Sequence, residues 1–209
     1  MNRLNFAGIF LLIFISGCMP IKPTINNQYT LNAYSKPYSS PKVALRRTLL
    51  LTQPEAMSGY QTEQMVYVNK LYERNAFAES AWVSSPATML YPLLIQSFQE
   101  SNAFNAIASS GYNDKVDYRL DTQLLTLQQN FLVKPSVLEF AAKVVLTRVE
   151  DNTVIASKLI RERITCPTDT PYGGVIAANK ATAAFTQDIR RFTIKKIQGD
   201  SQLKHGQTH

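Results

Sequence analysis

Apolar residues recur at two spacings along the chain, and each spacing predicts one kind of element. Over residues 116–124 apolar and polar residues alternate, so that Leu120 faces one side of a predicted strand and Arg119 the other. After Leu124 the alternation changes phase, which predicts a β-bulge at this point of the strand. A compact apolar run over 48–52 predicts a further, buried strand.

Two pairs of apolar segments predict β-hairpins, because only a short polar connection separates the members of each pair. The first pair is 64–68 and 71–77, joined by residues 69–70. The second pair is 137–149 and 153–165. The expected sheet is therefore antiparallel.

Spacings of three and four residues predict two amphipathic helices. Ser85 suits the N-cap of the first helix and Pro86 its first position. The second helix begins near Gly173 and Gly174, and its apolar stripe is expected to pack on the sheet, with a seam to a partner helix as the alternative. Six residues form that stripe: Val175, Ala178, Thr182, Phe185, Ile189 and Phe192.

Together these elements predict an α+β fold, in which an antiparallel sheet carries two main amphipathic helices as a single domain. We expect a signal peptide over 1–17, and a lipidated N-terminus with an extended, proline-rich tether over 18–41. The α+β domain is expected over 42–197 and a flexible polar tail over 198–209.

The start of the chain has the layout of a bacterial export signal. Arg3 precedes an apolar run over 6–15, and two small residues stand directly before Cys18. The run is too short to cross a bilayer, which takes about 20 apolar residues. The small residues match the lipoprotein box, so we expect Cys18 to be acylated, with palmitate among the chains, and to anchor the protein. An ordinary secreted protein with an incidental thiol at Cys18 is the alternative.

The residue after the cysteine favours one membrane. An aspartate there would indicate retention at the inner membrane, but the chain has Met19. The predicted location is therefore the outer membrane, with the domain facing the periplasm.

Composition and charge restrict the partners further. Hydrophobic residues make up 45% of the chain and charged residues 18%, as in an ordinary globular protein. The formal net charge is +7, but the basic residues are scattered, and nucleic-acid binding makes little sense for an exported protein. Anionic lipid headgroups, peptidoglycan or an acidic protein remain as partners.

The sequence offers little for catalysis. Its two histidines, His205 and His209, both lie in the polar tail, which disfavours a histidine-based triad or a zinc site. Asp117 and Asp121 share a predicted strand face, but Arg119 lies between them, so a solvated charge ladder is a better interpretation than a glycosidase pair. We therefore expect a protein that is not an enzyme and holds no cofactor or metal.

Aromatic residues gather between positions 60 and 91, and four of them are candidates for binding a partner. These are Tyr60, Tyr67, Tyr72 and Trp82, the last being the single tryptophan of the chain. Aromatic side chains with a polar group are favoured at interfaces. A hairpin packed on a helix also uses aromatics in its core, so burial of Trp82 remains the other interpretation.

A series of short motifs follows one another in a fixed order over most of the mature chain. The series comprises the lipoprotein box ending at Cys18, then 29–31, 49–51, 58–62, 64–67, Tyr72, Ala81 with Trp82, Pro86 with Met89 and Leu90, 101–104 and 117–120. In that order the motifs resemble the auxiliary lipoproteins of ABC-type intermembrane transport systems, of the kind found in the Pqi system.

The resemblance implies an outer-membrane lipoprotein of an MCE/ABC-type intermembrane lipid transport system. Such a protein would be a non-catalytic docking subunit in the periplasm. Its partners would be an MCE-domain protein and an inner-membrane permease, with phospholipid as a further contact. Family members form rings, which makes a homo-oligomer an expectation here. An outer-membrane lipoprotein that activates a peptidoglycan synthase is the alternative.

Overall fold

The computed structural model describes residues 24–36, 45–109 and 115–206 of the chain. These residues form two helices and nine strands, in the following order. The elements are β1 (Asn27–Tyr29), β2 (Thr48–Leu51), β3 (Glu55–Ala56), β4 (Gln64–Lys70), β5 (Glu73–Trp82), α1 (Pro86–Gln99), β6 (Ala106–Ser109), β7 (Tyr118–Asn130), β8 (Val137–Arg148), β9 (Thr153–Thr165) and α2 (Pro171–Gly206).

Strand β7 is central to the sheet, because both of its edges pair with other strands along most of its length. One edge pairs with β8 in antiparallel fashion, and β8 pairs with β9 in the same way. The other edge pairs in parallel with three short strands in succession, first β2, then β3, then β4. Beyond them, β6 adds to β2 in parallel, β5 pairs antiparallel with β4, and β1 pairs in parallel with β5.

The α+β class and the two packed helices are confirmed, but the sheet is mixed rather than antiparallel. The parallel pairs join segments that are far apart in the sequence, such as Leu49 with Tyr118. Their direction depends on how the chain crosses over through α1 and β6. Local alternation of apolar residues indicates a strand but not the direction of its distant neighbour.

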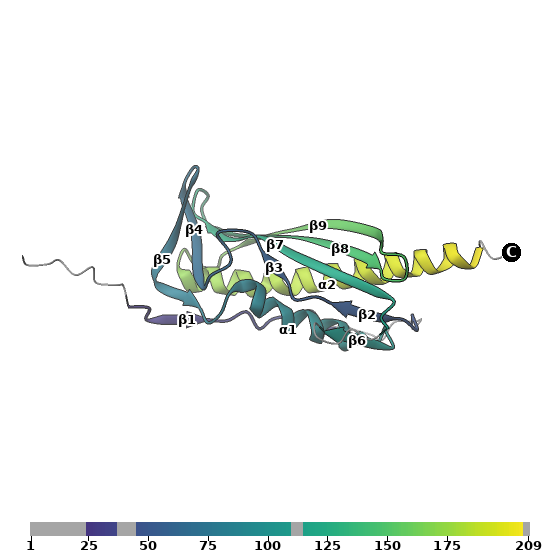
Figure 1. The fold of residues 1–209 in the computed structure, drawn as a ribbon. Coiled ribbons are helices and arrows are strands. Elements are labelled where there is room, and N and C mark those ends of the chain that lie inside the picture. The colour runs from purple at the N-terminus through teal and green to yellow at the C-terminus, as the bar shows by residue number, and fades with distance from the viewer. Residues whose placement is uncertain (1–23, 37–44, 110–114, 207–209) are drawn as a thin grey trace, which may run out of the picture.

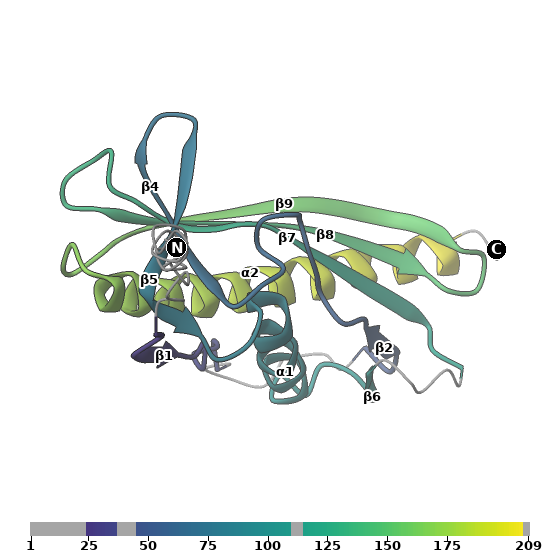
Figure 2. The same ribbon diagram turned by 60° about the vertical axis from the view of Figure 1, so that its left-hand side comes forward.

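Both helices cover the same face of the sheet, and the core lies between these two layers (Figure 2). The stripe of α2 packs as predicted: Val175, Ala178, Thr182, Phe185 and Ile189 are buried, and Phe192 is half-buried. The ring of Phe185 lies 4.9 Å from that of Phe140 on β8, centroid to centroid. In α1, Ser85 Oγ accepts a hydrogen bond from the backbone N of Thr88 at 3.4 Å, which confirms the predicted N-cap.

The strand predictions hold with one shift of position. The pairing of β7 with β8 changes register between Leu124 and Thr126, where the bulge is predicted. The first hairpin forms, but β4 continues to Lys70, so its turn is Leu71 and Tyr72 rather than 69–70. Lys70 Nζ lies 3.3 Å from Glu73 Oε2, so the two residues form an ion pair across the turn.

The segment 24–36, predicted to be part of a tether, belongs to the folded domain. Leu31 is 3% exposed, and the backbone N of Asn32 donates to Asn179 Oδ1 on α2 at 2.8 Å. The backbone carbonyl of Ser35 accepts a hydrogen bond from Arg190 Nη1 at 2.7 Å. The remainder of the predicted tether, with Cys18, lies outside the described residues.

The predicted flexible tail also begins too early. Helix α2 continues to Gly206, and Asp200 binds back to the sheet through an ion pair with Arg148 (Oδ1 to Nη1, 2.7 Å). The structural reason is that the first residue of β7, Tyr118, and the last residue of β8, Arg148, both bind Asp200 of α2. The final turns of α2 project beyond these strand ends (Figure 1). The prediction stays untested for 207–209, which are outside the described residues.

Candidate functional site

The β4–β5 hairpin carries or adjoins the four aromatic candidates, and it projects from the face of the sheet opposite the helices (Figure 2). Its two strands do not pair evenly. Gln64 pairs with Ala81 and Val66 with Ala76, so that Met65 alone lies opposite the longer segment 77–80 of β5. This wide bulge separates an outer part of the hairpin, which ends in its turn, from an inner part that belongs to the sheet.

Trp82 and Tyr60 lie in the core rather than on a contact surface. Trp82 is 3% exposed and Tyr60 is 5% exposed. The hydroxyl of Tyr60 donates to Gln128 Oε1 at 2.7 Å, and the guanidinium of Arg74 lies 5.5 Å from the centre of the Tyr60 ring. The core interpretation of Trp82 is therefore correct, and Tyr60 serves to fix the hairpin to β7.

Tyr67 belongs to an aromatic cluster at the base of the outer hairpin. Its ring centre lies 4.5 Å from that of Phe77 on β5 and 5.9 Å from that of Phe131, which follows β7. The rings of Phe77 and Phe131 are 6.3 Å apart in an edge-to-face arrangement. The cluster is half-buried, and it joins the hairpin to the connection between β7 and β8.

Tyr72 differs from the other three candidates because it is fully exposed. It forms the hairpin turn with Leu71, which is 65% exposed. The backbone of Tyr72 has a φ of 65°, in the left-handed region that aromatic residues rarely adopt. The tight turn requires this backbone conformation, and no other part of the described chain covers the Tyr72 side chain.

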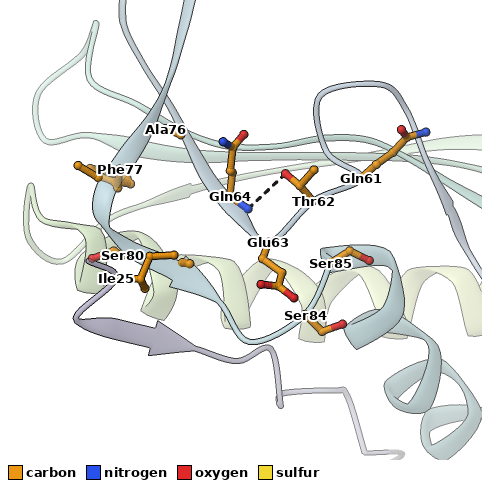
Figure 3. Close-up of a pocket in the computed structure, with 12 residues that line it drawn as sticks. Ile25, Gln61, Thr62, Glu63, Gln64, Ala76, Phe77, Ser80, Ser84 and Ser85 are labelled. Atoms are coloured by element: carbon orange, nitrogen blue, oxygen red, sulfur yellow. Dashed lines mark hydrogen bonds between the residues drawn. The ribbon is translucent and has the colours of Figure 1, made fainter. Parts of the chain in front are cut away.

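A hollow of about 820 Å³ lies where the bulge of β5 bends the hairpin away from the sheet (Figure 3). Ile25, Phe77 and three alanines supply its apolar lining, and serine, threonine, glutamine and one glutamate side chain supply the polar part. Thr62 Oγ1 accepts a hydrogen bond from the backbone N of Gln64 at 3.4 Å, which orders one rim. The lining suits contact with an amphipathic chain better than chemistry on a bound substrate.

The connection between β7 and β8 was not among the sequence candidates. Leu132 and Val133 in this connection are 43% and 38% exposed. The signal was present in the sequence, as two apolar residues between predicted strands and directly before Lys134 and Pro135. It was missed because a polar turn, rather than an apolar one, is the usual connection of a hairpin.

The acidic groups whose pKa values are lowered serve to hold the fold together. Arg148 binds both Asp151 (Nη2 to Oδ2, 2.7 Å) and Asp200, and its hydrogen bond lowers the pKa of Asp151. Burial raises the pKa of Tyr118, and so does the hydrogen bond that its hydroxyl donates to Asp200 at 2.8 Å. This network fastens the end of α2 to β7 and β8.

Two further features bear on anchoring and metal binding: membrane-spanning helices and clusters of metal-binding side chains. Neither helix within the described ranges combines the length and apolarity needed to cross a membrane. No group of three or more histidine, cysteine, aspartate or glutamate side chains is placed to hold a metal ion in the described part of the chain. Cys166, the cysteine that is described, is free and buried.

Comparisons with known proteins show the fold. No family model and no curated protein matches the chain. The structure of protein XCC0632 from Xanthomonas campestris, of family model DUF330, has a TM-score of 0.75 at 18% identity, over 84% of this chain and 99% of that one. A second crystal structure, of an uncharacterized protein, has a TM-score of 0.64 at 11% identity, over 79% of this chain and 97% of that one.

A bacterial lipoprotein lies at a greater structural distance. Lipoprotein GNA1162 from Neisseria meningitidis has a TM-score of 0.38 at 11% identity, over 69% of this chain and 99% of that chain. This similarity is too low to carry an argument. At such identities the first two structures establish a shared fold and leave function to the site itself.

Proposed function

We propose that this protein is a lipid-anchored, non-catalytic adaptor on the periplasmic face of the outer membrane. Within an MCE/ABC-type intermembrane lipid transport system, it would dock the MCE-domain protein and its inner-membrane permease. The observation that carries the proposal is the parallel pairing of β1 with β5. Because of it, residues 24–26, which lead toward Cys18 in the sequence, leave β1 in a fixed direction along β5.

The same pairing supports an adaptor that is held firmly rather than loosely. Asn27 pairs with Ser80 and Tyr29 with Trp82, and the backbone N of Val83 donates to Tyr29 O at 2.8 Å. Further along, Leu31 is buried in the core. An anchor at Cys18 would therefore act on the rigid domain through few intervening residues and would orient it on the membrane.

The shape of the domain supports a docking role. Helix α2 has 36 residues, which corresponds to about 54 Å. Strand β1 and the β4–β5 hairpin lie at one end of the molecule, and the C-terminal end of α2 lies at the other (Figure 1). One end would face the anchoring membrane, and the far end would stand free to meet a conduit from the inner membrane.

A non-catalytic role is supported by how the acidic groups are used. The hydrogen bond from the backbone N of Ser136, at 2.7 Å, lowers the pKa of Asp169, which places this carboxylate in a loop-fixing role. Asp151 and Asp200 are bound to Arg148. Acid–base catalysis needs a group whose pKa is tuned toward neutrality and which is free to reach a substrate. The pKa values of Asp151 and Asp169 are shifted away from neutrality. Burial raises the pKa of Glu162, which is half-buried on β9.

The anchor is tested with Cys18→Ala in the native host, because only the acylated cysteine would hold the domain on a membrane. We expect the wild-type protein to incorporate labelled palmitate and to sediment with outer membranes. The Cys18→Ala variant should do neither, although it should still fold. Cys166→Ala is the matched control, since it removes the other thiol and should leave fractionation unchanged. A Cys18→Ala variant that still sediments with outer membranes contradicts the anchor.

The transport role is tested by purification from native membranes, followed by identification of proteins and lipids that purify with the adaptor. We expect an MCE-domain protein in the complex. Recovery of a penicillin-binding protein in its place would favour the alternative, an activator of a peptidoglycan synthase. Turnover of a lipid or cell-wall substrate that a single internal aspartate or serine substitution abolishes would contradict the non-catalytic role.

A further inference from the structure

The β4–β5 hairpin ends in an apolar tip. Leu71 and Tyr72 are 65% and 103% exposed. Lys70 precedes them and is paired with Glu73 at the surface. The guanidinium of Arg74 turns back onto the ring of Tyr60, 5.5 Å from its centre. Two large apolar side chains at a protruding tip gain nothing from the fold of this chain, since no neighbouring element covers them. Their burial requires an external apolar phase.

A second apolar tip lies beside the first. Leu132 and Val133, in the connection between β7 and β8, are exposed and precede Lys134. The backbone N of Phe131 donates to Val68 O at 2.8 Å, and the Phe131 ring lies against Tyr67. The two connections are therefore joined at their bases. Both project from the sheet face that the helices leave open (Figure 2).

The chemistry of the tips matches the interfacial layer of a bilayer better than a protein groove. Tyrosine is favoured at the boundary between headgroups and acyl chains, where its ring is buried and its hydroxyl stays wet. Lysines beside apolar residues can extend toward the headgroups and are attracted to anionic lipids. The formal charge of +7 on the whole chain, to which Arg3 of the predicted signal peptide contributes one positive charge, acts in the same direction.

The described residues before β1 run toward the side of the domain that carries the tips. Because β1 is parallel to β5, residues 24–26 continue along β5 toward its start, and the backbone N of Asn26 donates to Glu79 O at 3.1 Å. Ile25 accordingly lines the hollow together with Ala76 and Phe77 (Figure 3).

The length of chain between Ile25 and Cys18 is sufficient for both contacts. From Phe77 to Tyr72 the strand rises about 17 Å, at roughly 3.3 Å per residue. The chain from Ile25 to Cys18 spans up to about 24 Å when extended. An acylated Cys18 could therefore lie in the plane of the membrane that the tips would touch.

We propose that the two tips, Leu71 with Tyr72 and Leu132 with Val133, form a docking surface for the interface of an anionic phospholipid bilayer. The tips would act with the acyl anchor as further points of contact and would fix the tilt of the domain on the membrane. This proposal deepens the proposed function, and it rests on that function only for the identity of the membrane. The contact between tips and lipid does not depend on acylation.

The test uses the mature chain with Cys18→Ala, which keeps every described residue and cannot be acylated. Its binding to vesicles of phosphatidylethanolamine and phosphatidylglycerol is measured by co-sedimentation, and compared with vesicles of phosphatidylcholine alone. We expect measurable partitioning to the anionic vesicles. The double substitution Leu71→Ser with Tyr72→Asn should weaken it about tenfold or more, because burial of each large apolar side chain contributes about 1.5–3 kcal/mol. Asparagine suits the left-handed backbone at position 72.

Two further variants separate the lipid contact from general effects. Val154→Ser removes from β9 an apolar residue whose exposure (59%) is close to that of Leu71 (65%), and it should leave binding unchanged. Lys134→Gln should weaken binding to anionic vesicles about fivefold and leave phosphatidylcholine binding unaffected, since a lysine near an anionic surface contributes about 1 kcal/mol. Thermal unfolding of each variant verifies that the fold is retained.

Two results would overturn the proposal. One is binding to vesicles that the tip substitutions leave unchanged. The other is an absence of vesicle binding while the same substitutions abolish binding to a purified protein partner, which would make the tips a protein interface. Neither result bears on palmitate incorporation at Cys18, so failure of this proposal is distinguishable from failure of the lipid anchor.

Discussion

Arg190 offers a sharp test of how the N-terminal segment is attached to the domain. Its side chain is buried in α2 with 6% exposure. Its Nη1 donates to the backbone carbonyl of Ser35 at 2.7 Å and to Ser97 Oγ on α1 at 2.6 Å. One guanidinium therefore joins three separate segments. Burial, and to a lesser extent the charge of Arg191, lowers the pKa of Arg190 from its ordinary value.

The expected effect of Arg190→Met follows from opposing contributions. A hydrogen bond to a charged group contributes about 1.5–3 kcal/mol, and a buried acceptor left without a partner costs about 1–3 kcal/mol. Removal of a desolvated charge offsets part of this loss. In the variant the hydroxyl of Ser97 can still donate to Ser35 O, which lies 3.4 Å from it in the wild-type structure. We expect the free energy of unfolding to fall by about 2 kcal/mol, with the methionine preserving most of the packing.

Urea unfolding followed by circular dichroism measures this change. Limited proteolysis under native conditions should show faster cleavage within 24–36, because that segment loses the hydrogen bond from Arg190 to the carbonyl of Ser35. Arg191→Met is the matched control: the neighbouring arginine is exposed, and its substitution should change stability by less than about 0.5 kcal/mol. Equal losses in the two variants, or a stable Arg190→Met with unchanged cleavage, would refute the role assigned to Arg190.

Three further predictions concern glycine, an aspartate and a thiol. Gly173→Ala should destabilise the protein by about 1–3 kcal/mol in urea unfolding, because the new Cβ would lie 2.1 Å from the carbonyl oxygen of Thr168. Gly199→Ala should stabilise α2 by about 0.5–1 kcal/mol in the same assay, because a Cβ at position 199 meets open space. Asp169→Asn should lower the urea midpoint at neutral pH. The folded-state pKa of Asp169 is lowered, so the wild-type advantage is present above about pH 3.8 and should disappear as the pH falls through that lowered value. Cys166 is 1% exposed and burial raises the pKa of its thiol, so alkylation at neutral pH should be at least about a hundredfold slower in the native protein than in urea; rapid native labelling would contradict its burial.

Local patterns predicted most of the elements because local forces decide them. Alternation located β7 and its bulge, and the stripe from Val175 to Phe192 located α2 and its buried face. Ser85 and Pro86 marked the start of α1, since capping involves residues within one turn. None of these features needs information from a distant part of the chain.

The candidate site was predicted less well, because exposure depends on neighbours that are distant in sequence. Tyr60, Tyr72 and Trp82 look alike as aromatics, yet two are buried and Tyr72 is fully exposed. Tyr60 is buried because β7 brings Gln128 against its hydroxyl. The turn at Leu71 and Tyr72 was placed two residues too early, since the end of β4 is fixed by cross-strand pairing rather than by the polarity of 69–70.

The sequence alone determined the α+β class and the apolar faces of both helices, because each depends on residues adjacent in the chain or on one turn of helix. The export signal with Cys18 comes from the same kind of local pattern and stays a prediction. The tertiary structure decided the parallel pairing of β7 with β2, β3 and β4, the docking of 24–36, and the extension of α2 through Asp200. Each of these joins segments far apart in sequence, and the free energy that selects them comes from burial and hydrogen bonds that exist only once those segments meet.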